Sequence, residues 1–143
     1  MLVQHVLDRK ASGVTTIGAD ATIADAAAEL SARKIGVLLI SRDGSALDGI
    51  LSERDIVRGL ATSGAGVLTQ PVSKLMTSKV VSCTPKDTVT SVLDKMSSGN
   101  FRHMPVLTNG TLTSILSLRD LMGARVEMAE AENSALTGMI AGY

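Results

Sequence analysis

The sequence reads Ile-Leu-Ser-Glu-Arg-Asp at residues 50–55 and Ile-Leu-Ser-Leu-Arg-Asp at residues 115–120. Five of the six letters agree, and in both places the phrase ends a short apolar run. The agreement extends upstream, because TIADA at 22–26 is matched by TVTSV at 88–92. Residues 14–61 and 80–126 are therefore two copies of one unit, and two copies with so long a period indicate a paired module rather than a solenoid.

Each copy predicts the element order β-α-β-β-α. A short extended run, VTTI or VVSC, precedes a threonine that stands where a helix N-cap is expected. Apolar residues then recur at helical spacing, and a strand-length run leads to Asp43-Gly44 or Asn109-Gly110, which are signals for hairpin turns. The repeated phrase ends the returning strand and begins the second helix. The expected fold class is α/β, of the α+β kind.

The length of the chain favours two small domains that share one fold. A unit of about 50–60 residues buries little of its own surface, so we expect the copies to pack as a pseudo-twofold pair with clefts between them. The predicted domains are residues 1–66, a short N-terminal helix and copy one, and residues 67–143, copy two with a helical extension through Met139. Residues 62–69 are expected to be a linker, followed by a short helix after Pro71.

Composition excludes several classes of function. The 14 basic and 14 acidic residues cancel, and aromatic residues are almost absent, which argues against binding to nucleic acid. No apolar run reaches the length of a membrane span, and no signal peptide is visible. Cys83 is the only cysteine, so we expect neither a disulfide nor a metal site, and Cys83 is expected to be a buried apolar residue. The predicted location is the cytoplasm.

The Ser-x-Arg-Asp phrase allows two interpretations. Serine followed three residues later by aspartate is typical of a helix capping box, with Asp in place of Glu. Alternatively, the helix N-terminus and the serine hydroxyl offer donors to a phosphate, while the carboxylate accepts from two ribose hydroxyls. The residues in question are Ser52 and Asp55 in copy one and Ser117 and Asp120 in copy two. The residue pattern alone leaves both interpretations open.

The duplicated unit resembles the tandem cystathionine-beta-synthase (CBS) domain pair, or Bateman module, in its stand-alone bacterial form. The motifs that carry the resemblance are ADATIADAAAEL with ILSERDIV, and PKDTVTSVLDKM with FRHMPVL and ILSLRDLM. Such pairs bind AMP, ADP, ATP, S-adenosylmethionine or sometimes NAD in the clefts between their two domains. The resemblance therefore implies an adenine nucleotide as ligand, with AMP as the first candidate, and a regulatory role.

The resemblance also implies which residues bind the nucleotide. The aspartates would hold the ribose and the serines would lie near ribose or phosphate. The first strand of each copy and the strand before the hairpin would line the adenine pocket, and basic residues would meet the phosphate. The implied residues are Thr15, Thr16, Ile17, Gly36, Val37, Leu38, Ser52, Arg54 and Asp55 in copy one, and Val81, Ser82, Arg102, His103, Met104, Pro105, Ser117, Arg119 and Asp120 in copy two.

Two further expectations concern activity and assembly. No nucleophile–base, zinc-protease or P-loop pattern is present, so we predict neither catalysis nor a catalytic cofactor. The family commonly dimerises through its helices, and a homodimer is expected, with a downstream protein target that the sequence does not identify. The competing interpretation is a dimerising interaction scaffold in which the clefts are vestigial and the Ser-x-x-Asp pairs serve only as helix caps.

Overall fold

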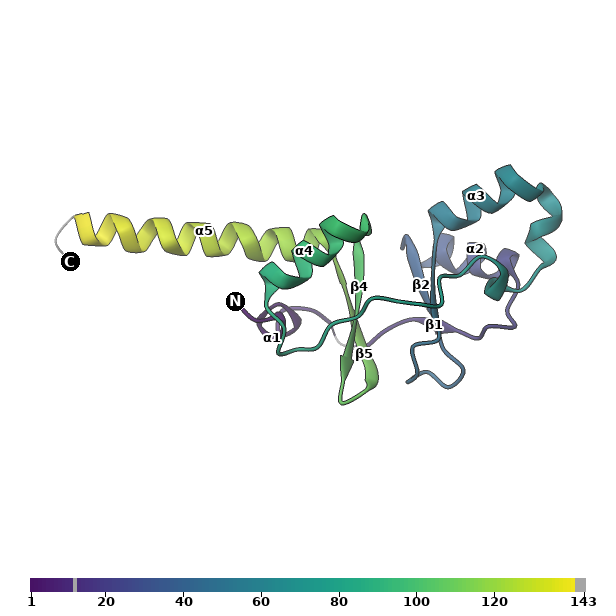
Figure 1. Ribbon diagram of the computed structural model, residues 1–143, viewed down its shortest axis with the longest axis horizontal. Helices are drawn as coiled ribbons and strands as arrows, with labels where there is room; N and C mark the ends of the chain where they lie inside the picture. The colour runs from purple at the N-terminus through teal and green to yellow at the C-terminus, as the bar shows by residue number, and fades with distance from the viewer. Residues whose placement is uncertain (12, 141–143) are drawn as a thin grey trace. The chain divides into compact units, whose positions relative to one another are not determined.

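A computed structural model describes residues 1–11 and 13–140 (Figure 1). The chain forms two compact units. The copy-one unit contains Gly13–Val81 and Thr108–Thr113, and the copy-two unit contains Met1–Ser12, Ser82–Leu107 and Ser114–Tyr143. Residue 12 and residues 141–143, which the predicted domains include, lie outside the described residues. The division of the chain after residue 66 remains a prediction.

The copy-one unit has the predicted element order, and its fold is confirmed as a mixture of helices and small sheets. Thr22 caps the first helix of the unit, because its side chain accepts a hydrogen bond from the Asp25 N–H. The elements are β1 (Thr16–Ile17), α2 (Ile23–Arg33), β2 (Val37–Ile40), β3 (Gly49–Ser52), α3 (Glu53–Ser63), and the 3-10 helices η1 (Ala65–Thr69) and η2 (Val72–Lys74).

The register of the copy-one sheet brings the repeated phrase beside the start of β2. Strand β1 runs parallel to β2, and β2 pairs antiparallel with β3, so that Val37 lies opposite Ser52. The Glu53 N–H then donates to the Gly36 carbonyl at 2.9 Å. The end of β3 and the first turn of α3 are therefore fixed to the residue that precedes β2.

The predicted linker is part of the folded unit instead of a loose connection. Its residues form η1, which packs against α2 and α3, and Val67 is buried there. Val72 at the start of η2 is fully buried, and its N–H donates to the Ala21 carbonyl at 2.8 Å. The composition of residues 62–69 suggested a linker because half of these residues are glycine or threonine. Nevertheless Val67 within it and Val72 just after it complete the core of the unit. The other core residues are Ile23, Ala26, Leu30, Leu38, Ile40, Leu51 and Ile56.

The hairpin predicted at Asp43-Gly44 is confirmed, since β2 and β3 pair antiparallel, but its connection is longer than a two-residue turn. Strands β2 and β3 are joined by an eight-residue loop, residues 41–48. The Asp43 carboxylate organises the loop by accepting hydrogen bonds from the N–H groups of Ala46 and Ser45 and from the Ser45 hydroxyl. These hydrogen bonds lower the pKa of Asp43 to about 2. An aspartate that caps the backbone ahead of it can stabilise a wide loop as well as a tight one.

The copy-two unit repeats the order with one difference. The strand expected in VVSC is reduced to a single bridge, in which Cys83 pairs in parallel with Val106. The turn at Asn109-Gly110 is confirmed, since both residues have positive φ, 52° and 80°, as a two-residue hairpin turn requires. The elements are α1 (Val3–Leu7), α4 (Val89–Gly99), β4 (His103–Thr108), β5 (Thr111–Ser117) and α5 (Leu118–Ile140).

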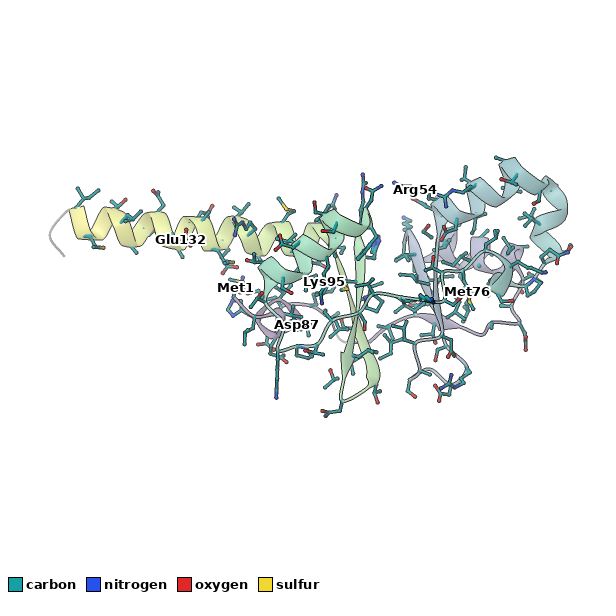
Figure 2. The ribbon with its side chains drawn as sticks, viewed as in Figure 1. Met1, Arg54, Met76, Asp87, Lys95 and Glu132 are labelled. Atoms are coloured by element: carbon teal, nitrogen blue, oxygen red, sulfur yellow. The ribbon has the colours of Figure 1, made fainter. Side chains whose placement is uncertain are left out.

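The N-terminal helix α1 belongs to the copy-two unit. The Val3 N–H donates to the Asp87 carbonyl at 2.8 Å, and the Val89 N–H donates to the Met1 carbonyl at 2.9 Å. Met1 and Asp87 are both labelled in Figure 2. The side chain of Val3 is fully buried in a core that also contains Val6, Cys83, Val89, Val92, Met96, Met104, Val106, Leu116, Leu121 and Ala124. The extended C-terminal helix predicted through Met139 is confirmed.

Candidate functional site

The repeated phrase forms the same capping box in both copies. In copy one the Ser52 N–H donates to Oδ2 of Asp55 at 2.8 Å, and the Asp55 N–H donates to Oγ of Ser52 at 3.1 Å. In copy two the corresponding distances between Ser117 and Asp120 are 2.9 and 3.1 Å. The structural interpretation of Ser-x-x-Asp is therefore confirmed at both positions, and each aspartate also places negative charge at a helix N-terminus.

The caps use only one carboxylate oxygen of each aspartate. The cap hydrogen bonds reach Oδ2 of each aspartate, and among the described residues Oδ1 of Asp120 accepts none. The nearest cation to Oδ1 of Asp55 is Nη1 of Arg58, at 3.7 Å, which is longer than a good hydrogen bond. Each serine hydroxyl accepts from a backbone N–H, and the proton of the Ser52 hydroxyl is available as a donor, whereas the Ser117 hydroxyl also interacts with the Asp120 carboxylate. A hydroxyl-rich ligand could thus bind without breaking the cap.

Lys10 joins the copy-two site from the N-terminal segment. Its Nζ donates to Oδ2 of Asp120 at 2.6 Å and to the Ile115 carbonyl at 2.9 Å. The lysine and aspartate side chains are 28% and 25% exposed, so this ion pair is partly shielded from water. Sequence reasoning missed Lys10, because it lies 110 residues away and outside any motif. Copy one has no lysine at Asp55 among the described residues, and its cation there is Arg58, at 3.7 Å, so the two carboxylates differ in how closely a cation approaches them.

The pKa of Asp120 is lowered by its surroundings. Partial burial alone would raise it, but hydrogen bonds from Lys10 and from the N–H and hydroxyl of Ser117, together with the charge of Lys10, outweigh that effect. A carboxyl whose folded pKa lies below its unfolded value of about 3.9 stabilises the fold above that pH. This contribution is lost as the pH falls through the folded pKa.

We therefore expect Asp120→Asn to reduce stability at pH 7 more than at pH 3. Asparagine keeps an oxygen for the cap but cannot form the ion pair with Lys10, whereas at low pH the parent carboxyl is itself becoming neutral. Urea unfolding of parent and variant at both pH values measures the gap, with Asp94→Asn, an exposed position on α4, as the control. An equal gap at both pH values would show that the Lys10–Asp120 pair contributes no net stability.

An open groove beside Asp120 gives this site access to solvent. It has a volume of about 370 Å³ and lies between α1 and α5. Its lining is rich in charge, and Arg9 forms an ion pair with Glu127 across it and contacts His5. The lining residues are His5, Val6, Arg9, Lys10, Arg119, Asp120, Gly123, Ala124 and Glu127.

A second groove, of about 550 Å³, lies in the copy-one unit between α2 and α3. It includes Gly36 but not Asp55, so it does not present the capping carboxylate. Apolar side chains, Lys34 and Glu53 line it, and a Cβ on Gly36 would lie 3.6 Å from Oε1 of Glu53. Gly36 is the one predicted site residue that lines this groove, and the groove is separate from the Ser52–Asp55 cap.

The structure gathers the other copy-one residues around the same sheet. Thr15, Thr16 and Ile17 are half-buried at β1, next to β2. Leu38 is fully buried in the core of the unit, so a ligand could meet it only through the backbone. Arg54 is exposed at the start of α3 (Figure 2). Val37 is also buried, and Val81, 44% exposed, falls in the copy-one unit although the sequence assigned it to copy two.

The copy-two residues divide in the same way between surface and core. Arg102 and Arg119 are exposed, His103 is half-buried at the start of β4, and Ser82 is half-buried before the Cys83 bridge. The Arg102 carbonyl accepts from the Leu118 N–H at 2.8 Å, which repeats the contact between Gly36 and Glu53. The remaining two predicted residues, Met104 and Pro105, are buried.

Comparison with known proteins decides the family. The family model for the CBS domain matches residues 7–62 and 72–127, one match for each copy of the repeat. The chain belongs to the CBS-domain family. The resemblance inferred from the two Ser-x-Arg-Asp phrases is therefore confirmed, and the β-α-β-β-α unit is a CBS domain in both copies.

Several CBS proteins are similar to this chain over most of its length. A CBS-domain protein from Agrobacterium tumefaciens, ATU1752, is 41% identical, with a TM-score of 0.83 over 87% of this chain and 99% of that one. PAE2072 from Pyrobaculum aerophilum, whose structure is a complex with AMP, is 29% identical, with a TM-score of 0.78 over 93% and 99%. A 17.7 kDa protein of Acidianus ambivalens is 35% identical over 80% of this chain and 69% of its own. The chain spans only about a quarter of the CBSCBSPB relatives from Arabidopsis thaliana.

Other kinds of site are not evident in the described part of this CBS pair. None of its helices is long and apolar enough to cross a membrane, and residues 1–11 and 13–140 contain no cluster of His, Cys, Asp and Glu suited to a metal ion. The prediction for Cys83 is confirmed, since it is buried, and burial together with the nearby Asp87 carboxylate raises the pKa of its thiol to about 11. A protonated, buried thiol is a poor nucleophile.

Proposed function

We propose that this CBS pair is a regulatory module that binds an adenine nucleotide, AMP being the first candidate and ATP, ADP, NAD(H) and S-adenosylmethionine the others, and that it catalyses no reaction. One observation carries the proposal. Each copy presents a carboxylate oxygen and a serine hydroxyl at the N-terminus of a long helix. The location expected from the sequence, a cleft between the copies, stays a prediction.

The chemistry of the phrase suits a nucleotide in particular. A carboxylate accepts hydrogen bonds from the hydroxyls of a ribose, and these charge-assisted bonds are stronger than neutral ones. The helix N-terminus and the serine hydroxyl favour a phosphate, which the exposed Arg102 could also approach. A bound AMP in PAE2072, a CBS protein 29% identical to this chain, supports the same ligand class here.

The second candidate is a dimerising scaffold in which the phrase only caps helices. The capping boxes themselves favour it, and so does the occupation of Asp120 by Lys10. The two candidates differ in what each expects of the aspartates. A scaffold needs only the cap oxygen, whereas a nucleotide site also needs Oδ1, which accepts no hydrogen bond from the described residues in either copy.

Thermal unfolding with a panel of ligands separates these candidates. AMP, ATP, NAD(H) and S-adenosylmethionine are each added in excess over the protein. A ligand present at about 100 times its Kd stabilises the fold by about 2.7 kcal/mol, which raises the melting temperature by several degrees. Unchanged melting curves across the panel would favour the scaffold. Guanosine monophosphate, which has the same ribose phosphate as AMP but a different base, tests whether the adenine base is recognised.

Lys10 is expected to weaken the copy-two site. Its ammonium group donates to Oδ2 of Asp120, the cap oxygen, and partly neutralises the negative charge that would attract a ribose hydroxyl to Oδ1. Lys10→Met keeps the length of the side chain and removes the charge, and we expect it to tighten binding at this site severalfold. Isothermal titration of AMP into parent and variant measures the change, with Lys86→Met as the control. A weaker complex would instead show that Lys10 itself contacts the nucleotide.

A further inference from the structure

The second half of α5 has no packing partner among the described residues. Only Leu121 and Ala124 of this 23-residue helix are buried, and both lie near its start. From residue 129 onward almost every side chain is exposed, and Figure 1 shows this part of the helix extending past α1 and α4. Helical segments of about 12 residues are marginal in water without tertiary contacts. A partner is therefore expected to cover this segment.

Large apolar residues are concentrated on the same helix. Of the eight large hydrophobic side chains that are exposed among the described residues, five lie on α5. Four of these, Met122, Val126, Leu136 and Ile140, fall on one face with Ala129 and Asn133, at alternating spacings of four and three residues. Glu132, labelled in Figure 2, lies on the same exposed stretch of helix.

The spacing is that of a coiled-coil seam. With Met122, Ala129 and Leu136 at heptad d positions, the a positions are Val126, Asn133 and Ile140. Val126 and Ile140 are β-branched residues at a, which favour a parallel two-stranded coil, and Leu136 is the one leucine among the three d positions. A single asparagine at a, Asn133, fixes register and orientation because two such amides can hydrogen-bond to each other. Leu121 and Ala124, which face the core of the unit, fall outside this seam, so the seam can be used without unfolding the unit.

The charges beside the seam agree with a parallel pairing. In this register Arg125 is at a g position and Glu130 is at the following e position. Parallel coils bring a g residue of one helix beside the e residue five positions later on the other, so Arg125 would face Glu130 of a second copy. Both side chains are exposed and available for that contact.

We infer that α5 pairs with α5 of a second copy of this chain as a short, parallel, in-register coiled coil. The seam residues Met122, Val126, Ala129, Asn133, Leu136 and Ile140 form the contact. Its length, under three heptads, makes it a supplement to other contacts between chains rather than a strong dimer by itself. The inference does not depend on nucleotide binding, so a negative result with the ligand panel leaves it unchanged.

Disulfide cross-linking provides the direct test. In a parallel, in-register coil Leu136 faces its own counterpart, so L136C chains are expected to cross-link rapidly as dimers under mild oxidation. A131C, on the opposite side of the helix, is the matched control and should cross-link far more slowly. The buried Cys83 contributes little background. Equal rates for the two variants, or no cross-linking of L136C, would overturn the inference, since an antiparallel coil does not bring residue 136 beside itself.

A charge exchange tests register separately. R125E places two acidic groups in contact and should raise the Kd of the coil severalfold in sedimentation equilibrium at low salt, and E130R should do likewise. The double variant R125E/E130R restores opposite charges and should return the Kd to the parent value. Failure of the double variant to recover would contradict the proposed register. Neither position is in the core, so each variant is expected to fold, and circular dichroism checks this.

Discussion

We expect the replacement of Leu116 by alanine to lower the free energy of unfolding by about 2–5 kcal/mol. Leu116 is fully buried on β5, and truncating it removes apolar contacts and leaves a cavity in the copy-two core. Leu51 is its counterpart in copy one, is equally buried, and should show a loss of similar size. Since a domain of this size is stable by only about 5–15 kcal/mol, either change is a large fraction of the total.

Urea unfolding measures both losses, and the double variant gives further information. The two leucines belong to separate core clusters that share no residue, so their effects are expected to add to within about 0.5 kcal/mol. Val57→Ala, at an exposed position on α3, is the control and should change stability little. A loss below about 1 kcal/mol at Leu116 would show that the core collapses around the vacancy.

The second large effect concerns the ligand. If AMP stabilises the protein, Asp55→Asn and Asp120→Asn are expected to weaken its binding by about tenfold to a hundredfold at their own sites. A hydrogen bond from a ribose hydroxyl to a charged carboxylate contributes about 1.5–3 kcal/mol, and asparagine accepts with only one atom. Asparagine keeps the cap oxygen, so the helix N-terminus is retained and a change in affinity reports on the ligand contact.

Calorimetric titration of AMP into the two variants measures this effect site by site. Asp25→Asn, which changes an aspartate in the capping box of α2, is the matched control, because Asp25 has the same cap geometry without a proposed ligand role. Affinity unchanged in both Asp55→Asn and Asp120→Asn would remove the ribose assignment. A loss in Asp55→Asn alone would indicate that only the copy-one site binds, which the presence of Lys10 at Asp120 would explain.

Local sequence signals predicted the parts of the fold that depend on neighbouring residues. The caps at Thr22 and Thr88, the turn at Asn109-Gly110 and the boxes at both aspartates all form within a few residues of chain. The predictions that the structure corrects fall where distant packing decides. In the loop around Asp43 the Ser45 carbonyl accepts from the distant Leu112 N–H, and the strand before Cys83 is short because it pairs with β4 at a single position.

The amino-acid sequence by itself determined the duplication, the element order, the CBS family and the two capping aspartates, because these are written in short motifs and in periodicity. Tertiary structure alone decided that α1 packs on copy two, that residues 65–72 complete the core of copy one, and that Lys10 reaches Asp120. The physical reason is one of range. Caps and turns satisfy backbone groups a few residues away, whereas the ion pair between Lys10 and Asp120, 110 residues apart, exists only after the core of the copy-two unit has brought distant segments together.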